Sequence, residues 1–142
     1  MKISISILLL FVFFYQINAQ KKAEAEQLVT EGIKFHDKGD YQAAISLYDR
    51  ALALDKDNLY ALGEKAFSLL MIGNQDECIT CCKKAIKVHK GSDRLNNVYV
   101  CYGNALDEKG EAEKALKVYD DGIKQFPEFY SFILTRELPI QE

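Results

Sequence analysis

Apolar residues recur at spacings of three and four from Ala23 onward, which is the spacing of one face of an α-helix. Alanine, leucine, lysine and glutamate, which favour helices, are frequent, and only two prolines occur. No stretch alternates between apolar and polar residues as a half-buried strand does. The pattern therefore predicts an all-α chain built from amphipathic helices.

Three short segments interrupt the helical pattern, and each has a glycine followed by a polar residue. The glycines are Gly39, Gly73 and Gly110, spaced 34 and then 37 residues apart. Glycine tolerates the positive φ that ends a helix, and Asp40 and Asn74 can accept backbone N–H groups at the start of the next helix. Each segment is therefore predicted to be a tight turn between two helices.

Regular spacing in this range is typical of a repeat array. Aligning the turns predicts a lead-in at 20–24, repeats at 25–58, 59–92 and 96–129, and an insertion at 93–95. We expect the insertion to lengthen a helix or a loop.

The residues at matching places in the repeats alternate between large and small. The first repeat has Leu28, Gly32, Phe35, Tyr41, Ala44, Tyr48 and Ala51; the second has Leu62, Ala66, Leu69, Cys78, Cys82 and Ala85; the third has Tyr99, Gly103, Leu106, Ala115, Tyr119, Gly122 and Pro127. This pattern resembles the tetratricopeptide repeat family. The resemblance implies three stacked helix-turn-helix units in a right-handed α-solenoid. No Trp occurs, and Glu31 and Lys65 stand where that family usually has leucine.

Small residues let paired helices approach closely. We expect Gly32, Ala66 and Gly103 to face Ala44, Cys78 and Ala115 across each helix pair. A bulky residue at any of the first three positions should cost about 1 to 3 kcal/mol through overpacking.

The N-terminus is typical of a signal peptide. Lys2 precedes an apolar run that ends at Tyr15, and small Ala19 follows shortly afterwards. We expect cleavage after Ala19, which makes residues 1–19 a leader and the mature protein periplasmic or secreted, with no membrane span. An uncleaved anchor, followed by Lys21 and Lys22, is the alternative.

Without that leader the chain has 17 basic and 21 acidic side chains, a net charge of −4. Such a balance argues against a nucleic-acid-binding surface.

The last segment, 130–142, is predicted to form a capping helix and tail. It contains Phe132, Ile133, Leu134 and Leu138, and Pro139 ends the helix. We expect it to cover the apolar face of the last repeat. The alternative is a structural subunit that oligomerises through residues 129–138.

The cysteines are the residues most suggestive of chemistry. Cys78 and Cys81 form a Cys-x-x-Cys pair, which is also a thiol redox arrangement. Their expected place inside a repeat helix favours core packing or a disulfide, with Cys101 as the partner of Cys82 or Cys78. A zinc site is disfavoured because three thiols are bunched and the fourth is separate. We therefore expect no metal.

No phosphate-binding loop or nucleophile motif occurs, and His36 and His89 are far apart. We therefore predict no enzymatic activity and no cofactor.

The resemblance implies that the first helix of each repeat lines a concave groove that holds a protein or peptide. It places on that groove Val29, Ile33, His36, Tyr60, Phe67, Asn97 and Asn104. Some members of the family grip a C-terminal carboxylate with Lys, Asn and Arg, but the matching residues here are Val29, Ile33, Glu64, Asn97 and Cys101. That carboxylate clamp is therefore absent, and the sequence predicts an exported adaptor or scaffold with an uncharged, partly aromatic groove. Part of this aromatic strip could instead be core between repeats.

Overall fold

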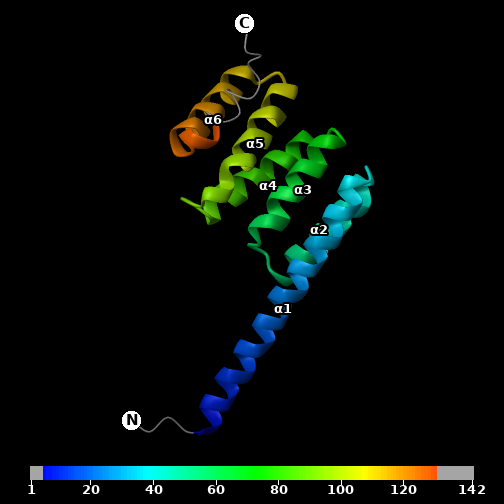
Figure 1. The fold of residues 1–142 in the computed structure, drawn as a ribbon, viewed down its shortest axis with the longest axis vertical. Coiled ribbons are helices and arrows are strands. Elements are labelled where there is room, and N and C mark those ends of the chain that lie inside the picture. Colours follow the sequence, from blue (N-terminus) through cyan, green and yellow to red (C-terminus); the bar gives the residue numbers. More distant parts are fainter. Residues whose placement is uncertain (1–4, 131–142) are drawn as a thin grey trace, which may run out of the picture.

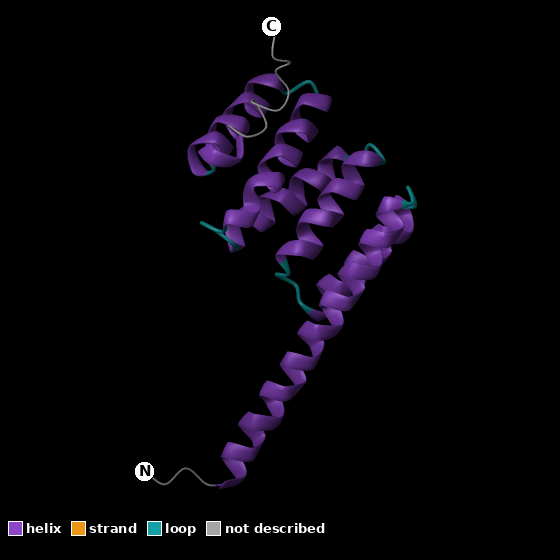
Figure 2. Ribbon diagram, in the orientation of Figure 1, coloured by secondary structure: helices purple, strands orange, loops and turns teal. Residues whose placement is uncertain are grey.

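The structure, a computed structural model, describes residues 5–130, and all regular elements in that range are helical. Its elements are α1 (Ile5–Asp37), α2 (Tyr41–Leu54), α3 (Leu59–Met71), α4 (Gln75–Val88), the 3-10 turn η1 (Asp93–Leu95), α5 (Asn96–Glu108) and α6 (Ala112–Gln125). Residues 127–130 are helical as well. The predicted all-α fold class is confirmed, as Figure 2 shows.

The helices form a stack of hairpins (Figure 1). The second half of α1 pairs with α2, α3 with α4, and α5 with α6, while α2 also contacts α3 and α4 contacts α5. In addition, α1 touches α3 and α3 touches α5, so the first helices of the hairpins form one continuous layer. In this layer α3 lies in the middle, which makes it the central wall of the predicted groove.

The predicted turns occur where the glycines stand. Gly39, Gly73 and Gly110 have φ values of 80°, 74° and 75°, a region that side chains with a Cβ rarely adopt. The Asp40 and Asn74 side chains accept backbone N–H groups of α2 and α4. These local contacts set where each hairpin bends. The predicted insertion forms η1, which places Leu95 in the core.

The close approaches predicted at Gly32 and Gly103 are present, but tyrosine rings fill them. A Cβ at Gly32 would lie 2.5 Å from Cε1 of Tyr48, and a Cβ at Gly103 would lie 2.1 Å from Cε1 of Tyr119. The alanines that we expected to face these glycines are buried in the same core. The tyrosine rings nevertheless make the nearest contact, because they extend across the gap between the paired helices.

Repeat 2 uses a different pair of residues at the same two places. Ala66 stands where the other repeats have glycine, and Cys82 stands where they have Tyr48 and Tyr119; both residues of this pair are fully buried. A larger residue on one helix thus accompanies a smaller one on its partner, which avoids overlap in a close-packed interior. This exchange accounts for Cys82, whereas Cys78 stands where the other repeats have Ala44 and Ala115.

Lys65, which departs from the family pattern, is almost buried and joins three helices. Its ammonium nitrogen lies 2.7 Å from a carboxylate oxygen of Asp49 on α2 and 2.5 Å from one of Glu77 on α4. The Lys65 side chain is only 10% exposed, while both carboxylates reach solvent. An ion pair therefore occupies a position where an apolar contact is usual.

The predicted leader forms the first half of α1, which extends away from the stacked helices (Figure 1). Its apolar side chains from Ile7 to Tyr15 are exposed, and Ala25 is the first buried residue of the described chain. Among residues 5–130, no helix has both the length and the apolar content needed to cross a membrane. The core therefore begins only after the predicted cleavage site.

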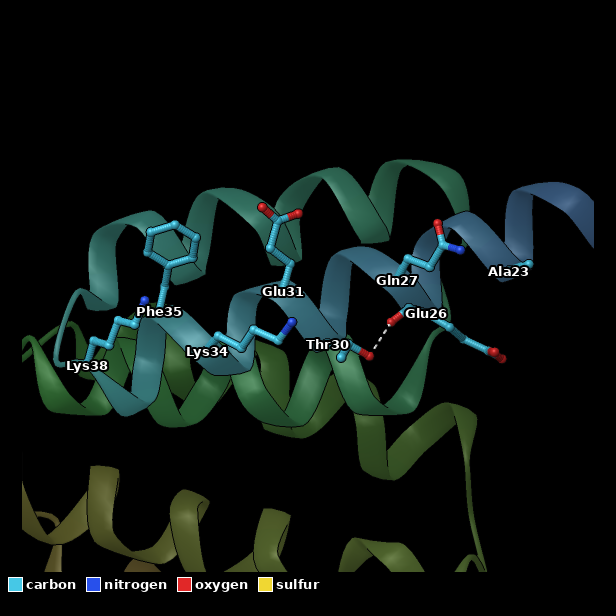
Figure 3. Close-up of a pocket in the computed structure, with 8 residues that line it drawn as sticks. All are labelled: Ala23, Glu26, Gln27, Thr30, Glu31, Lys34, Phe35 and Lys38. Carbon is cyan, nitrogen blue, oxygen red and sulfur yellow. Dashed lines mark hydrogen bonds between the residues drawn. The ribbon is translucent and has the colours of Figure 1, made fainter.

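The α1 end of the stack is polar. Figure 3 shows the shallow pocket on this face, lined by Ala23, Glu26, Gln27, Thr30, Glu31, Lys34, Phe35 and Lys38. The counterparts of Gln27 and Phe35 one repeat later are Ala61 and Leu69, which are buried. The pocket on repeat 1 therefore corresponds to the surface through which a later repeat contacts the repeat before it.

The α6 end is apolar instead. Leu116 is 65% exposed, whereas its counterparts Ile45 and Ile79 are buried in the cores shared with the following repeats. The predicted capping helix lies outside the described residues except for Tyr130, and so does most of the segment predicted to oligomerise. Both stay predictions.

Candidate interaction groove and thiol cluster

The middle helix α3 carries two large exposed aromatic side chains on one face. Tyr60 is 50% exposed and Phe67 is 44% exposed, and they stand seven residues apart, which is two helical turns. Amphipathic packing usually places such side chains in the core. The first helices of the hairpins form the inner layer of the stack, and α3 is its central helix. The exposure of these two side chains on α3 makes this strip the candidate interaction surface.

Phe67 is held in place by a contact with α1. The ring of His36 stacks on the ring of Phe67, with 4.9 Å between centroids and 28° between planes. Nδ1 of His36 lies 2.7 Å from the buried Oγ of Ser68, within hydrogen-bonding distance, and Tyr41 meets the imidazole edge-on. His36, predicted as a groove residue, therefore fixes the orientation of one aromatic side chain and joins repeat 1 to repeat 2.

An acidic group lies beside this stack. Glu64 is half-buried on α3, one turn before Phe67. Burial raises the pKa of the Glu64 carboxyl; the neighbouring His36 acts to lower it, and Asp37 adds to the rise. Because Asp37 and Glu64 are both acidic, this part of the surface favours a cation over an anion.

Tyr60 is held at the other end of the strip by Arg94, which the sequence did not single out. The guanidinium of Arg94 donates a hydrogen bond to the Tyr60 hydroxyl, and its Cζ lies 4.8 Å from the centre of the tyrosine ring. Arg94 belongs to the three-residue insertion now seen as η1. The insertion was the only sequence signal for this contact, since its partner lies 34 residues earlier in the chain.

The other predicted groove residues have different surroundings. Val29 is only 5% exposed and belongs to the core of repeat 1, so its predicted place on the groove surface is wrong. Ile33, one turn later, is half-buried. Asn97 and Asn104 are exposed on α5, and Oδ1 of Asn104 accepts a 2.6 Å hydrogen bond from the Tyr119 hydroxyl.

The cysteines form a second feature, between α4 and α5. The sulfur atoms of Cys78, Cys82 and Cys101 all lie within 4.8 Å of one another, and those of Cys78 and Cys101 are 3.5 Å apart. All four cysteines are free and buried. Hydrogen bonds from Cys101 and Cys82 hold the pKa of the Cys78 thiol below its usual range. We call these three residues the thiol cluster.

Cys81 lies outside the thiol cluster. Burial raises the pKa of its thiol to about 11, with Lys65 opposing the rise. A thiol that stays protonated at neutral pH is a poor nucleophile. This environment disfavours the alternative in which Cys78 and Cys81 act as a redox pair.

With this geometry in view, comparison with known proteins identifies the hairpins. Residues 35–100 match the family model described as "Tetratricopeptide repeat". Residues 35–100, which include parts of all three hairpins, therefore match the tetratricopeptide repeat. Two relatives are "Small glutamine-rich tetratricopeptide repeat-containing protein 2" of Mycosarcoma maydis, 31% identical over 74% of this chain and 29% of the relative, and "Hsp70-Hsp90 organizing protein" of Triticum aestivum, 34% identical over 63% and 16%. The chain thus spans less than a third of either relative.

A solved tetratricopeptide domain has the same fold. The second such domain of Spaghetti (RPAP3), solved with the HSP90 peptide SRMEEVD, superimposes with a TM-score of 0.69 over 75% of this chain and 95% of that domain, at 24% identity. This similarity shows the fold alone. It supports the predicted stack of helix-turn-helix units. The ligand of the present chain has to be inferred from the chain's own surface residues.

Proposed function

We propose that this tetratricopeptide chain is an adaptor or scaffold that holds a protein partner on the groove wall formed by α3. The observation that supports it most strongly is the pair of exposed aromatic side chains, Tyr60 and Phe67, each fixed by a neighbouring element. Aromatic side chains held in one rotamer lose little entropy on binding, and they are often the residues that dominate an interface.

The charge beside these side chains supports a partner segment that combines apolar and cationic residues. Glu64 and Asp37 lie next to the His36 stack, and no Lys or Arg stands at the positions where the carboxylate clamp would be. The peptide bound by the RPAP3 domain, SRMEEVD, is acidic. Beside the His36 stack an acidic C-terminus would meet carboxylates, and Arg94 at the other end of the strip is already engaged with Tyr60. We therefore propose that the partner differs from that peptide in charge.

Exchanging both aromatic residues for glutamate, Y60E/F67E, is expected to abolish partner capture. The variant removes the apolar contact and adds two charges to the groove, and loss of a central interface residue typically costs about 2 kcal/mol or more. Affinity capture from the cells that make the protein, quantified by mass spectrometry, measures the result. The peptide SRMEEVD, followed by fluorescence anisotropy, should show no saturable binding to the wild-type chain.

The matched control is V88E. Val88 on α4 has the same 44% exposure as Phe67, but it lies on a second helix of a repeat, outside the inner layer. This variant should retain the wild-type partners. Identical capture by wild type and Y60E/F67E would show that the partner uses another surface, and tight binding of SRMEEVD would refute the proposed charge preference.

We also propose that the chain is exported and that its leader is removed. The exposed apolar run from Ile7 to Tyr15 and the start of the core at Ala25 support this, because residues 7–19 contain no buried side chain that cleavage after Ala19 would remove. The intact mass of the protein from its own cells should correspond to a chain that starts at Gln20. A fragment 20–142 should unfold at the same temperature as the full chain. A retained leader would refute cleavage.

A further inference from the structure

We propose that Cys78 and Cys101 are a covalent modification site at which a disulfide joins repeat 2 to repeat 3. The thiol cluster lies between α4 and α5, where the two repeats meet, and its sulfur atoms belong to both. The inference does not depend on the proposed groove, since the cluster is part of the core.

The geometry favours this pair, because its sulfur atoms are 3.5 Å apart, whereas distances within the cluster reach up to 4.8 Å. Cys78 and Cys82 stand four apart on one helix, where Cβ atoms are about 5 to 6 Å apart, whereas a disulfide needs about 3.5 to 4.5 Å. A bridge between them would distort α4. Cys101 comes from the other helix, and its sulfur already lies 3.5 Å from that of Cys78. Small side-chain rotations can therefore close the bond.

The surroundings favour a disulfide over a metal ion. Three thiols this close could hold a thiophilic ion, but three thiolates around a monovalent or divalent ion would leave a net negative charge in a buried site. The core around them is made of apolar side chains such as Leu62, Leu95 and Ala105. The charged residue that acts on Cys78 is Glu108, another anion. A disulfide carries no charge, so it suits this apolar site better.

The reaction is a two-step exchange with a low-molecular-weight disulfide such as oxidised glutathione. The Cys78 thiolate, whose pKa lies below its usual range, attacks one sulfur of the oxidant and releases the first glutathione thiol. The sulfur of Cys101, the more exposed of the two at 7%, then attacks Sγ of Cys78 in this mixed disulfide and releases the second glutathione thiol, to which its proton passes. Two cysteine thiols lose two electrons, the oxidant becomes two thiols, and the cysteine protons end on them.

The bridge would tie α4 to α5 and leave Cys82 as a free thiol. Since α5 also contacts α3 on the groove side, the cross-link would restrict sliding of repeat 3 against the central wall. Export to an oxidising compartment would favour the bridged form, although the chemistry itself can be tested in vitro.

The test is oxidation of the purified full chain with oxidised glutathione, followed by denaturation and alkylation without reductant. Before alkylation, oxidised wild type should have a mass two hydrogens below that of the reduced chain, and after alkylation it should carry two alkylated cysteines. Non-reducing peptide mapping should find the peptides of Cys78 and Cys101 joined. The C81A and C82A variants should keep this bridge, whereas C78A and C101A should lose it. Alanine is chosen because it is small, apolar and helix-favouring, so the variants should still fold.

A second measurement separates the bridge from general effects on folding. Reductant should lower the unfolding temperature of oxidised wild type and C81A, but leave those of C78A and C101A unchanged. Four alkylated cysteines after oxidation, a bridge that instead joins Cys82 to Cys101, or a stoichiometric metal ion retained by the reduced chain would each overturn the proposal.

Discussion

Replacing Gly103 by alanine is expected to lower the free energy of unfolding by about 1 to 3 kcal/mol, although alanine favours helices more than glycine does. The new Cβ would lie 2.1 Å from Cε1 of Tyr119, so the ring or one of the helices has to move. Denaturation of G103A followed by circular dichroism measures the change.

Gly63 provides the matched control within the same fold. A Cβ there would meet its nearest side-chain atom, Cγ2 of Val98, at an ordinary 3.6 Å. The G63A variant should therefore gain about 0.5 to 1 kcal/mol from the helix preference alone. Adding Y119C to G103A reproduces the pair seen in repeat 2 and should recover part of the loss. If G103A is as stable as wild type, the tyrosine does not set the spacing of the helices.

Reversing the charge of Lys65 is expected to destabilise the protein by about 3 kcal/mol or more, because K65E would leave a nearly buried carboxylate facing two others. Its neighbours would be Asp49 and Glu77, which now contact the ammonium group. K65M should lie within about 1 kcal/mol of wild type, since an apolar side chain of similar length can replace a buried ion pair. Urea denaturation at pH 7 compares the two variants.

The ion pair also has a pH signature. Burial lowers the pKa of Lys65, but hydrogen bonds to Asp49 and Glu77 outweigh it, so the pKa lies above that of a free lysine. The folded state then binds this proton more tightly than the unfolded state. The stabilisation is present below about pH 10.4 and is lost as the pH rises further. The stability difference between wild type and K65M should change in that alkaline range. A constant difference would contradict the ion pair.

The sequence predicted the features that depend on neighbouring residues. Gly39, Gly73 and Gly110 have positive φ, and α3 and α5 begin at Leu59 and Asn96, the first residues of the predicted second and third repeats. Each turn is specified within a few residues by a glycine, and at the first two turns also by a capping side chain, Asp40 or Asn74, so a local pattern is sufficient to find it.

The groove was predicted less well because it depends on contacts between repeats. Val29 occupies a helical position that faces the groove in the family pattern, yet repeat 1 packs it into its core. The contacts of Arg94 with Tyr60 and of Lys65 with Asp49 join residues more than ten positions apart. A single sequence does not show such pairs, since Arg94 and Lys65 taken alone resemble ordinary surface charges.

The two ends of the stack have opposite character, and this difference gives the array a direction. A helix added at the α1 face would have to desolvate Glu31 and Lys34, whereas one added at the α6 face would cover Leu116 and Ile123, which are apolar and exposed. Desolvating unpaired charges is costly, while covering apolar surface is favourable. We therefore expect an additional helix to bind more readily at the α6 face than at the α1 face.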